Sequence, residues 1–244
     1  MLPKIWIFDT YSIMLFIGVL LCLLLYRHYA KSNNINSKYT YDILLLGCIS
    51  VFTGLIFASL FQLLFDLLKE NSTNQLFSMT FYGGLVGGVI CFLLGYFLII
   101  KKRYKEANFS NDILTIAPAC ITLAHGIGRI GCFLAGCCYG IETDSFLGVK
   151  FPHLDHNVYP TQLYEAFFLL LLTFVLYILA MKLHCKYNLC IYLFSYGVFR
   201  FLLEFIRGDD RGAFFLSLSP SQLFSIIAII VSIGLFIYLK FIKE

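Results

Sequence analysis

The residues best suited to chemistry are charged side chains embedded in apolar sequence. Tyr196, Arg200, Glu204 and Arg207 are separated mainly by Phe and Leu. Their spacing of three or four residues places them on one face of a helix. An arginine in mid-membrane costs about 2.5–3.5 kcal/mol on insertion scales and marks function more often than not. An Arg–Glu pair that only holds helices together is the alternative interpretation.

A glycine-rich segment, residues 125–140, contains His125 and Arg129. Glycine lets a backbone bend sharply and approach a ligand closely. Backbone N–H groups in such turns favour anions, and the guanidinium fork of Arg129 suits a phosphate. Arg129 and Arg200 facing one cavity would form a phosphate clamp. The alternative is a glycine-rich motif for helix packing.

Two shorter segments add further polar candidates. Gln162 and Glu165 follow Pro160, which fits a helix start, and their separation of three residues points both side chains the same way. Polar capping at the membrane interface would explain Gln162 better than Glu165. Taken by itself, the segment Tyr82-Gly83-Gly84 indicates a helix interface built from small residues.

The cysteines do not lead us to expect a metal site. Cys132, Cys137 and Cys138 have a C-x4-C-C spacing, which is not a usual structural zinc pattern. Small-residue packing is the default interpretation, and a disulfide among external cysteines stays open. We therefore predict no metal and no cofactor, and we treat His153 and His156 as loop residues.

The elements that must position these residues are transmembrane helices. The 244 residues are 60% hydrophobic and 13% charged, whereas a soluble domain carries about 25% charged residues. At roughly 20 residues per span, this length fits six to eight spans. We predict an all-α integral membrane protein with seven spans, at residues 11–26, 42–65, 80–100, 112–126, 161–181, 189–206 and 220–239.

The basic residues predict how the spans are oriented. Eleven of the 18 Lys and Arg lie in four segments that share one side if every span crosses fully. The positive-inside rule places that side in the cytoplasm, with the N-terminus outside and the C-terminus inside. We expect one transmembrane domain, residues 1–244, with an external or re-entrant element at 127–160. Because the basic residues are thin loop clusters, we expect no nucleic-acid binding.

Together these motifs resemble the prolipoprotein diacylglyceryl transferase family of bacterial plasma membranes. The match covers nearly the whole chain, in the right order. The family's motifs are matched by Tyr82-Gly83-Gly84-Leu85, by Gly128-Arg129-Ile130-Gly131 followed by Gly136 and Gly140, by Pro160 through Glu165, and by Tyr196-Gly197 with Arg200 and Glu204. Tyr11 lies where the family has a tyrosine in its first span, although an aromatic-belt residue would look the same.

The resemblance implies a reaction and a set of site residues. The family transfers a diacylglyceryl group from phosphatidylglycerol to the lipobox cysteine of a prolipoprotein and releases glycerol phosphate. Charge grows on the departing phosphate, which arginines can stabilise. The implied catalytic residues are His125, Arg129, Arg200, Glu204 and Tyr82. The implied substrate-binding residues are Tyr11, Gly83, Gly84, Gly128, Gly131, Cys132, Gly136, Gly140, Gln162, Glu165 and Tyr196.

Several positions depart from the family pattern. Tyr82 replaces the motif histidine, and a tyrosine with a pKa of about 10 is a poor base. Cys132 replaces the signature asparagine, and Cys137 falls where the family has a glutamate. His125, which we place at the external end of the fourth span, is our hypothesis for the replacement base. These departures leave open a paralogous transferase with another acceptor. A transporter of a phosphorylated small molecule is a second alternative, because Arg129 and Arg200 could serve there too.

Overall fold

The fold is almost entirely helical, and the prediction of seven spans is confirmed. The computed structural model describes residues 4–5, 8–68, 81–208 and 218–241, and the side chains of residues 9–64, 83–208 and 218–241. Seven helical segments of the described chain are long and apolar enough to cross a membrane. They are Thr10–Ser32, Ser37–Leu64, Gly83–Arg103, Ser110–Ala135, Thr161–Leu183, Asn188–Ile206 and Pro220–Phe241.

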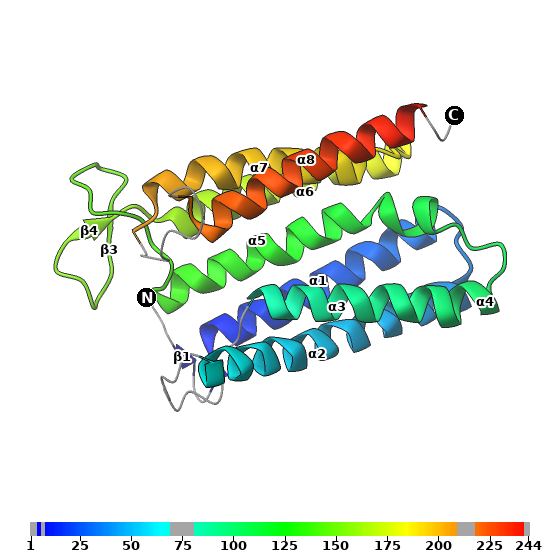
Figure 1. The fold of residues 1–244 in the computed structure, drawn as a ribbon, viewed down its shortest axis with the longest axis horizontal. Coiled ribbons are helices and arrows are strands. Elements are labelled where there is room, and N and C mark those ends of the chain that lie inside the picture. Colours follow the sequence, from blue (N-terminus) through cyan, green and yellow to red (C-terminus); the bar gives the residue numbers. More distant parts are fainter. Residues whose placement is uncertain (1–3, 6–7, 69–80, 209–217, 242–244) are drawn as a thin grey trace. The chain divides into compact units, whose positions relative to one another are not determined.

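Each span corresponds to one labelled helix or to two or three consecutive ones (Figure 1). The helices are α1 (Thr10–Ser32), α2 (Ser37–Leu68), α3 (Phe81–Gly95), η1 (Tyr96–Ile100), α4 (Lys101–Arg103), η2 (Ser110–Leu114), α5 (Ala117–Ala135), α6 (Thr161–Leu183), α7 (Asn188–Leu203), η3 (Glu204–Ile206) and α8 (Pro220–Phe241). Four two-residue strands form two antiparallel hairpins: β1 (Lys4–Ile5) with β2 (Phe8–Asp9), and β3 (Val149–Lys150) with β4 (Asn157–Val158).

The chain divides into two compact units. Unit one consists of residues 1–26 and 109–244, and unit two of residues 27–108. In unit one, α5 packs on α6, α6 on α7, and α7 on α8. In unit two, α2 packs on α3. Every candidate residue named above except Tyr82, Gly83 and Gly84 belongs to unit one.

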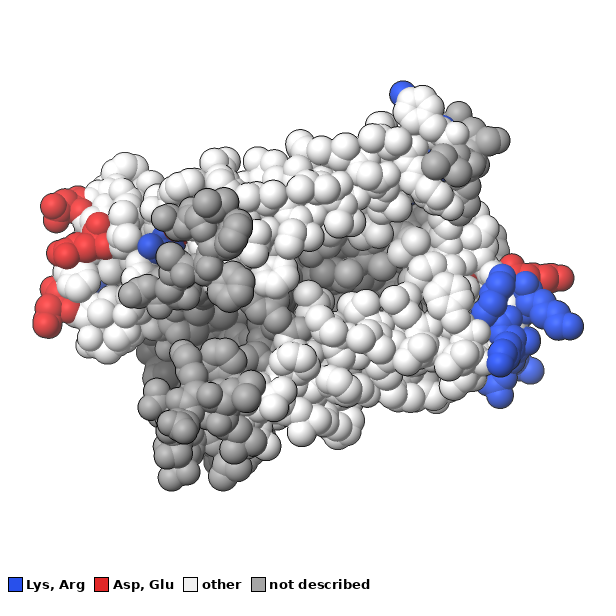
Figure 2. Space-filling model, in the orientation of Figure 1, with Lys and Arg blue, Asp and Glu red and all other residues white. Residues whose placement is uncertain are grey.

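Charged side chains gather at one end of each unit (Figure 2). In unit one, exposed acidic residues surround β3 and β4, namely Glu142, Asp144 and Asp155. In unit two, the exposed Lys101, Lys102 and Arg103 of α4 form a basic end. The acidic sign near β3 and β4 and the basic sign of α4 are those that the predicted orientation assigns to these segments, and the orientation itself stays a prediction.

A buried asparagine fastens the start of α7 to its neighbours. Asn188 is fully buried, and its amide donates hydrogen bonds to the carbonyls of Thr115 (2.7 Å) and Leu176 (3.0 Å). Replacing it with alanine leaves two buried carbonyls without these donors, which costs about 1–3 kcal/mol per unsatisfied group. We expect Asn188→Ala to lower the thermal unfolding midpoint in detergent. An unchanged midpoint would show that these hydrogen bonds do not hold unit one together.

Candidate active site

A buried carboxylate, Glu165, lies at the centre of the first polar cluster. The side chain is 1% exposed and projects from the first turns of α6. One carboxylate oxygen lies 3.0 Å from Arg129 Nε, and the other accepts a hydrogen bond of 2.8 Å from the Tyr196 hydroxyl. His125 Nε2 lies 3.6 Å from that second oxygen, and its ring meets the Tyr196 ring edge to face. Three helices thus contribute to one buried network.

A second carboxylate, Glu204, organises Arg200 of α7 and Arg207, which follows η3. Arg200 Nη2 lies 2.7 Å from Glu204 Oε2 and donates a 3.0 Å hydrogen bond to Ser221 Oγ of α8. Arg207 Nε lies 4.0 Å from the same carboxylate oxygen. Ser219 Oγ donates a 2.7 Å hydrogen bond to the other oxygen. Arg200 and Glu204 thus lie on one face as predicted with Tyr196, but Arg207 follows η3 in an extended conformation and is not on the helix.

The two clusters together carry an excess of positive charge. Arg200 and Glu165 interact electrostatically, as do Arg200 and His125. The three guanidiniums and two carboxylates of these clusters carry one net positive charge. Arg200 Nη1 is buried and has no hydrogen-bond partner among the described residues. A buried cation with a donor to spare favours an anionic ligand.

The fourth span ends later than the sequence predicted. Helix α5 continues to Ala135, so residues 127–135 are helical and Arg129 projects from a regular helix. His125 therefore lies ten residues before the helix end, about 15 Å along the axis, and its expected place at the end of the span is wrong. The glycines permit close packing instead of breaking the helix: a methyl group on Gly126 would lie 3.2 Å from the Leu170 side chain of α6.

The loop after α5 is fixed to the start of α6. Gly136, with φ of 75°, ends the helix in the left-handed region that glycine tolerates. Gln162, 1% exposed, donates a hydrogen bond from its amide to the Cys137 carbonyl. Its Oε1 is buried without a hydrogen-bond partner in the described part of the chain. Gly140 lies so close to η3 that an added methyl group would meet the Ile206 carbonyl at 2.5 Å.

The three cysteines of this region lie together at the end of α5. Cys132 is buried on the helix, while Cys137 and Cys138 follow in the loop. The Cys137 thiol donates a hydrogen bond to the Cys132 carbonyl. The pKa of the Cys138 thiol lies well below its ordinary value because of the adjacent Cys132 and Cys137 thiols and, less strongly, Arg207 and Arg129. Arg129 and Arg207 thus interact with this cysteine group as well as with the two glutamates.

Two glycines of α5 allow a matched comparison. A methyl group on Gly131 would lie 2.9 Å from Met14 Cβ and 3.4 Å from Tyr11 Cα, because α1 crosses the helix there. A methyl group on Gly128 would meet nothing within 4 Å. We expect Gly131→Ala to destabilise the protein by about 1–3 kcal/mol, and Gly128→Ala to stabilise it by up to about 1 kcal/mol, because alanine has the higher helix propensity. Equal losses of stability in the two variants would refute this packing argument.

The remaining candidates are Tyr11 and the glycines of unit two. Tyr11 is 42% exposed near the start of α1, its backbone faces Gly131, and its side chain interacts electrostatically with Arg129 and Cys132. In unit two, a methyl group on Gly84 would lie 3.2 Å from Ala58 Cβ, so helix packing is a sufficient reason for a glycine there. Gly83 is buried on the same helix. The side chain of Tyr82 lies outside the described residues.

The sequence interpretation missed Ser219 and Ser221. Both are hydrogen-bonded to the charged cluster, but serines at a helix start are ordinary capping residues and carry no distinguishing signal. Only the packing of α8 on α7 makes them partners of Arg200 and Glu204.

The fold and the site define a multi-pass membrane protein whose helices enclose a buried, net positive polar cluster. The family model for prolipoprotein diacylglyceryl transferase matches residues 4–238, and the chain belongs to that family. It is 31% identical to the phosphatidylglycerol–prolipoprotein diacylglyceryl transferase of Clostridium tetani, over 96% of this chain and 94% of that protein. It is 33% identical to the protein of the same name from Dehalococcoides mccartyi, over 93% of this chain and 88% of that protein.

Proposed function

We propose that this protein transfers the diacylglyceryl group of phosphatidylglycerol to the lipobox cysteine of a prolipoprotein. The observation that carries the proposal is the buried, net positive cluster in which Arg200 retains an unused donor. The relatives are phosphatidylglycerol–prolipoprotein diacylglyceryl transferases by name, which supports this choice of substrates. The alternatives, another acceptor or transport of a phosphorylated molecule, become outcomes of the test below.

The reaction is a substitution at carbon. The thiolate sulfur of the acceptor attacks the terminal glycerol carbon of the diacylglycerol moiety. A carbon–sulfur bond forms, the bond from that carbon to the phosphate oxygen breaks, and the electron pair leaves with glycerol phosphate. The thiol proton goes to a base. Arg129 and Arg200 would stabilise the negative charge that grows on the leaving oxygen.

The remaining residues would hold these arginines and the substrates in position. Glu165 and Glu204 fix one arginine each, at 3.0 and 2.7 Å. Tyr196 holds the Glu165 carboxylate by its hydroxyl group. Gln162 keeps the loop after α5 in place and could offer its unpartnered Oε1 to a substrate hydroxyl. Gly128, beside open space, would leave room for the lipid.

His125 is our proposal for the base that accepts the thiol proton. Its Nε2 lies 3.6 Å from Glu165, which would stabilise the imidazolium formed in the reaction. We expect His125→Ala to lose about 10²–10⁴ of the rate at pH 6–7 and to recover part of it as pH approaches the thiol's own pKa of about 8.5. Steady-state rates between pH 6 and 9 test this. Full activity of the variant across pH 6–8 would remove His125 from the mechanism.

The proposal includes a setting in the bacterial plasma membrane. We place the N-terminus outside and the C-terminus in the cytoplasm, so that the acidic end of unit one, with β3 and β4, faces outward. The basic α4 supports this orientation through the positive-inside rule.

A direct assay tests the function. The purified protein is incubated in detergent with phosphatidylglycerol and a lipobox peptide, and mass spectrometry searches for a diacylglyceryl thioether on the peptide cysteine. We expect this product from the wild type, and none when the peptide cysteine is serine. Peptide left unmodified by a folded protein in the presence of both substrates would favour another acceptor. Flux of a phosphorylated molecule without chemistry, measured after reconstitution into vesicles, would favour transport.

A further inference from the structure

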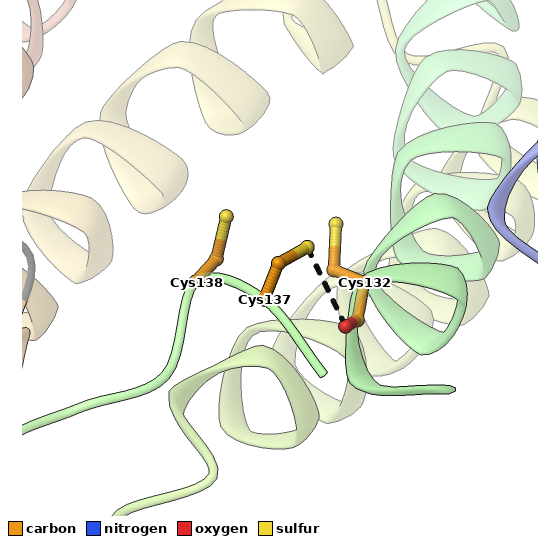
Figure 3. A group of neighbouring side chains, drawn as sticks. All are labelled: Cys132, Cys137 and Cys138. Atoms are coloured by element: carbon orange, nitrogen blue, oxygen red, sulfur yellow. Dashed lines mark hydrogen bonds between the residues drawn. The ribbon is translucent and has the colours of Figure 1, made fainter. Parts of the chain in front are cut away.

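Three cysteine sulfurs converge at the end of α5. The sulfur atoms of Cys132, Cys137 and Cys138 all lie within 4.8 Å of one another. Figure 3 shows the three side chains next to each other, with their sulfur atoms on the same side of the loop. The nearby glutamate-centred clusters do not use these thiols as ion-pair partners, so the proposed transfer leaves their grouping unexplained.

The backbone brings the thiols together before any ligand binds. Gly136 (φ 75°) and Cys138 (φ 63°) both adopt the left-handed region, which turns the chain back over the end of α5. A residue with a side chain seldom adopts this conformation. The Cys137 N–H donates to the Cys132 carbonyl at 3.1 Å, and Thr161 Oγ1 donates to the Cys138 carbonyl at 3.0 Å. The turn is thus fixed at both ends.

We propose that Cys132, Cys137 and Cys138 form a binding site for a thiophilic cation of the Zn²⁺ or Cu⁺ type. A zinc–sulfur bond is about 2.3 Å long, so two sulfurs on a tetrahedral ion lie about 3.8 Å apart. The sulfur–sulfur distances here are at most 4.8 Å, about 1 Å longer, and rotation of the side chains can close that difference. Thiolate ligands select these soft cations over Mg²⁺ and Ca²⁺.

The surroundings suit the charge of such a site. Three thiolates and one Zn²⁺ carry one net negative charge, and the bound thiols release their protons to solvent. Arg129 and Arg207 both interact electrostatically with Cys138. Cys137 is exposed, which gives an ion a path from solvent, while the buried Cys132 shields one side of the site. A bound cation would tie the loop to α5 beside Arg129.

The test is metal binding by the reduced, purified protein, with Zn²⁺ and Co²⁺ as the probes. We expect one equivalent of Zn²⁺ to bind in competition with a chromophoric chelator, and Co²⁺ to give sulfur-to-cobalt charge-transfer absorption. Cys137→Ser and Cys138→Ser are expected to weaken binding by at least about 100-fold, because losing even a hydrogen-bond partner of a metal ligand costs about 10–100-fold. Cys48→Ser, which removes an exposed thiol of α2, is the matched control and should bind as the wild type does.

A second measurement needs no substitution. In the wild type, Zn²⁺ should protect Cys132, Cys137 and Cys138 from alkylation, and peptide mapping would identify the protected thiols. Protection of these three but not of Cys48 supports the site. Zn²⁺ binding that persists in both serine variants overturns the proposal, as does the absence of binding in the folded, reduced wild type. A disulfide within the trio in protein taken from native membranes would also overturn it.

Discussion

Replacing Arg129 with alanine is expected to lower the rate of diacylglyceryl transfer by at least about 100-fold, the usual effect of removing one preorganised charge-stabilising donor. Arg129 lies 3.0 Å from Glu165, which is 1% exposed. The variant should therefore also lose stability, because breaking a buried ion pair costs about 3–5 kcal/mol. Rate and thermal unfolding are measured on the same preparation.

The double variant Arg129→Ala/Glu165→Gln separates the two effects. Neutralising the carboxylate removes the uncompensated buried charge, so stability should return towards that of the wild type while the rate stays low. Arg103→Ala is the matched control, because this exposed arginine of unit two pairs only with Asp42 among the ion pairs found in the described residues. Recovery of the rate in the double variant would show that Arg129 serves stability alone.

Arg200→Ala is expected to abolish both transfer and the inhibition of transfer by added glycerol phosphate. Arg200 is held by Glu204 and Ser221, and its buried Nη1 is free to donate to the leaving phosphate. Arg200→Lys keeps the charge but loses the planar fork, so it should retain only part of the rate. The readout is the inhibition of transfer by glycerol phosphate. If Arg200 were only structural, its loss would change the rate of the folded protein but not its affinity for glycerol phosphate.

Ser221→Ala is the control for Arg200. It removes one hydrogen bond to the guanidinium and leaves the Glu204 ion pair at 2.7 Å in place. We expect the transfer rate to fall by about tenfold or less, in line with a net hydrogen-bond contribution of about 0.5–1.5 kcal/mol.

Unchanged glycerol phosphate inhibition in Arg200→Ala would contradict the phosphate-binding role of Arg200.

Local spacing was enough to predict several parts of the site. The i to i+4 spacing of Arg200 and Glu204 predicted a common helix face, on which the two form an ion pair, and the hydropathy pattern predicted all seven spans. The common face of Gln162 and Glu165 also agrees with the structure, where both are buried at the start of α6. Each of these features depends only on helix geometry, which sequence spacing specifies directly.

Features that depend on packing between distant segments were not predictable. Glycine has a low helix propensity, so residues 127–135 read as a loop, yet the packing of α5 against α1 and α6 keeps them helical. Ser221 meets Arg200 only through α8 packing. The C-x4-C-C spacing did not predict that the three thiols converge. Their convergence depends on the left-handed conformation of Gly136 and Cys138, which the sequence does not reveal.

The most direct test of the central claim is to count both products in one reaction. The wild type is incubated with phosphatidylglycerol and a lipobox peptide, and the diacylglyceryl thioether and glycerol phosphate are quantified together. The mechanism predicts equal amounts of the two, rising in parallel and both lost in Arg200→Ala. Glycerol phosphate released without thioether, or thioether formed at the wild-type rate by Arg200→Ala, would contradict it.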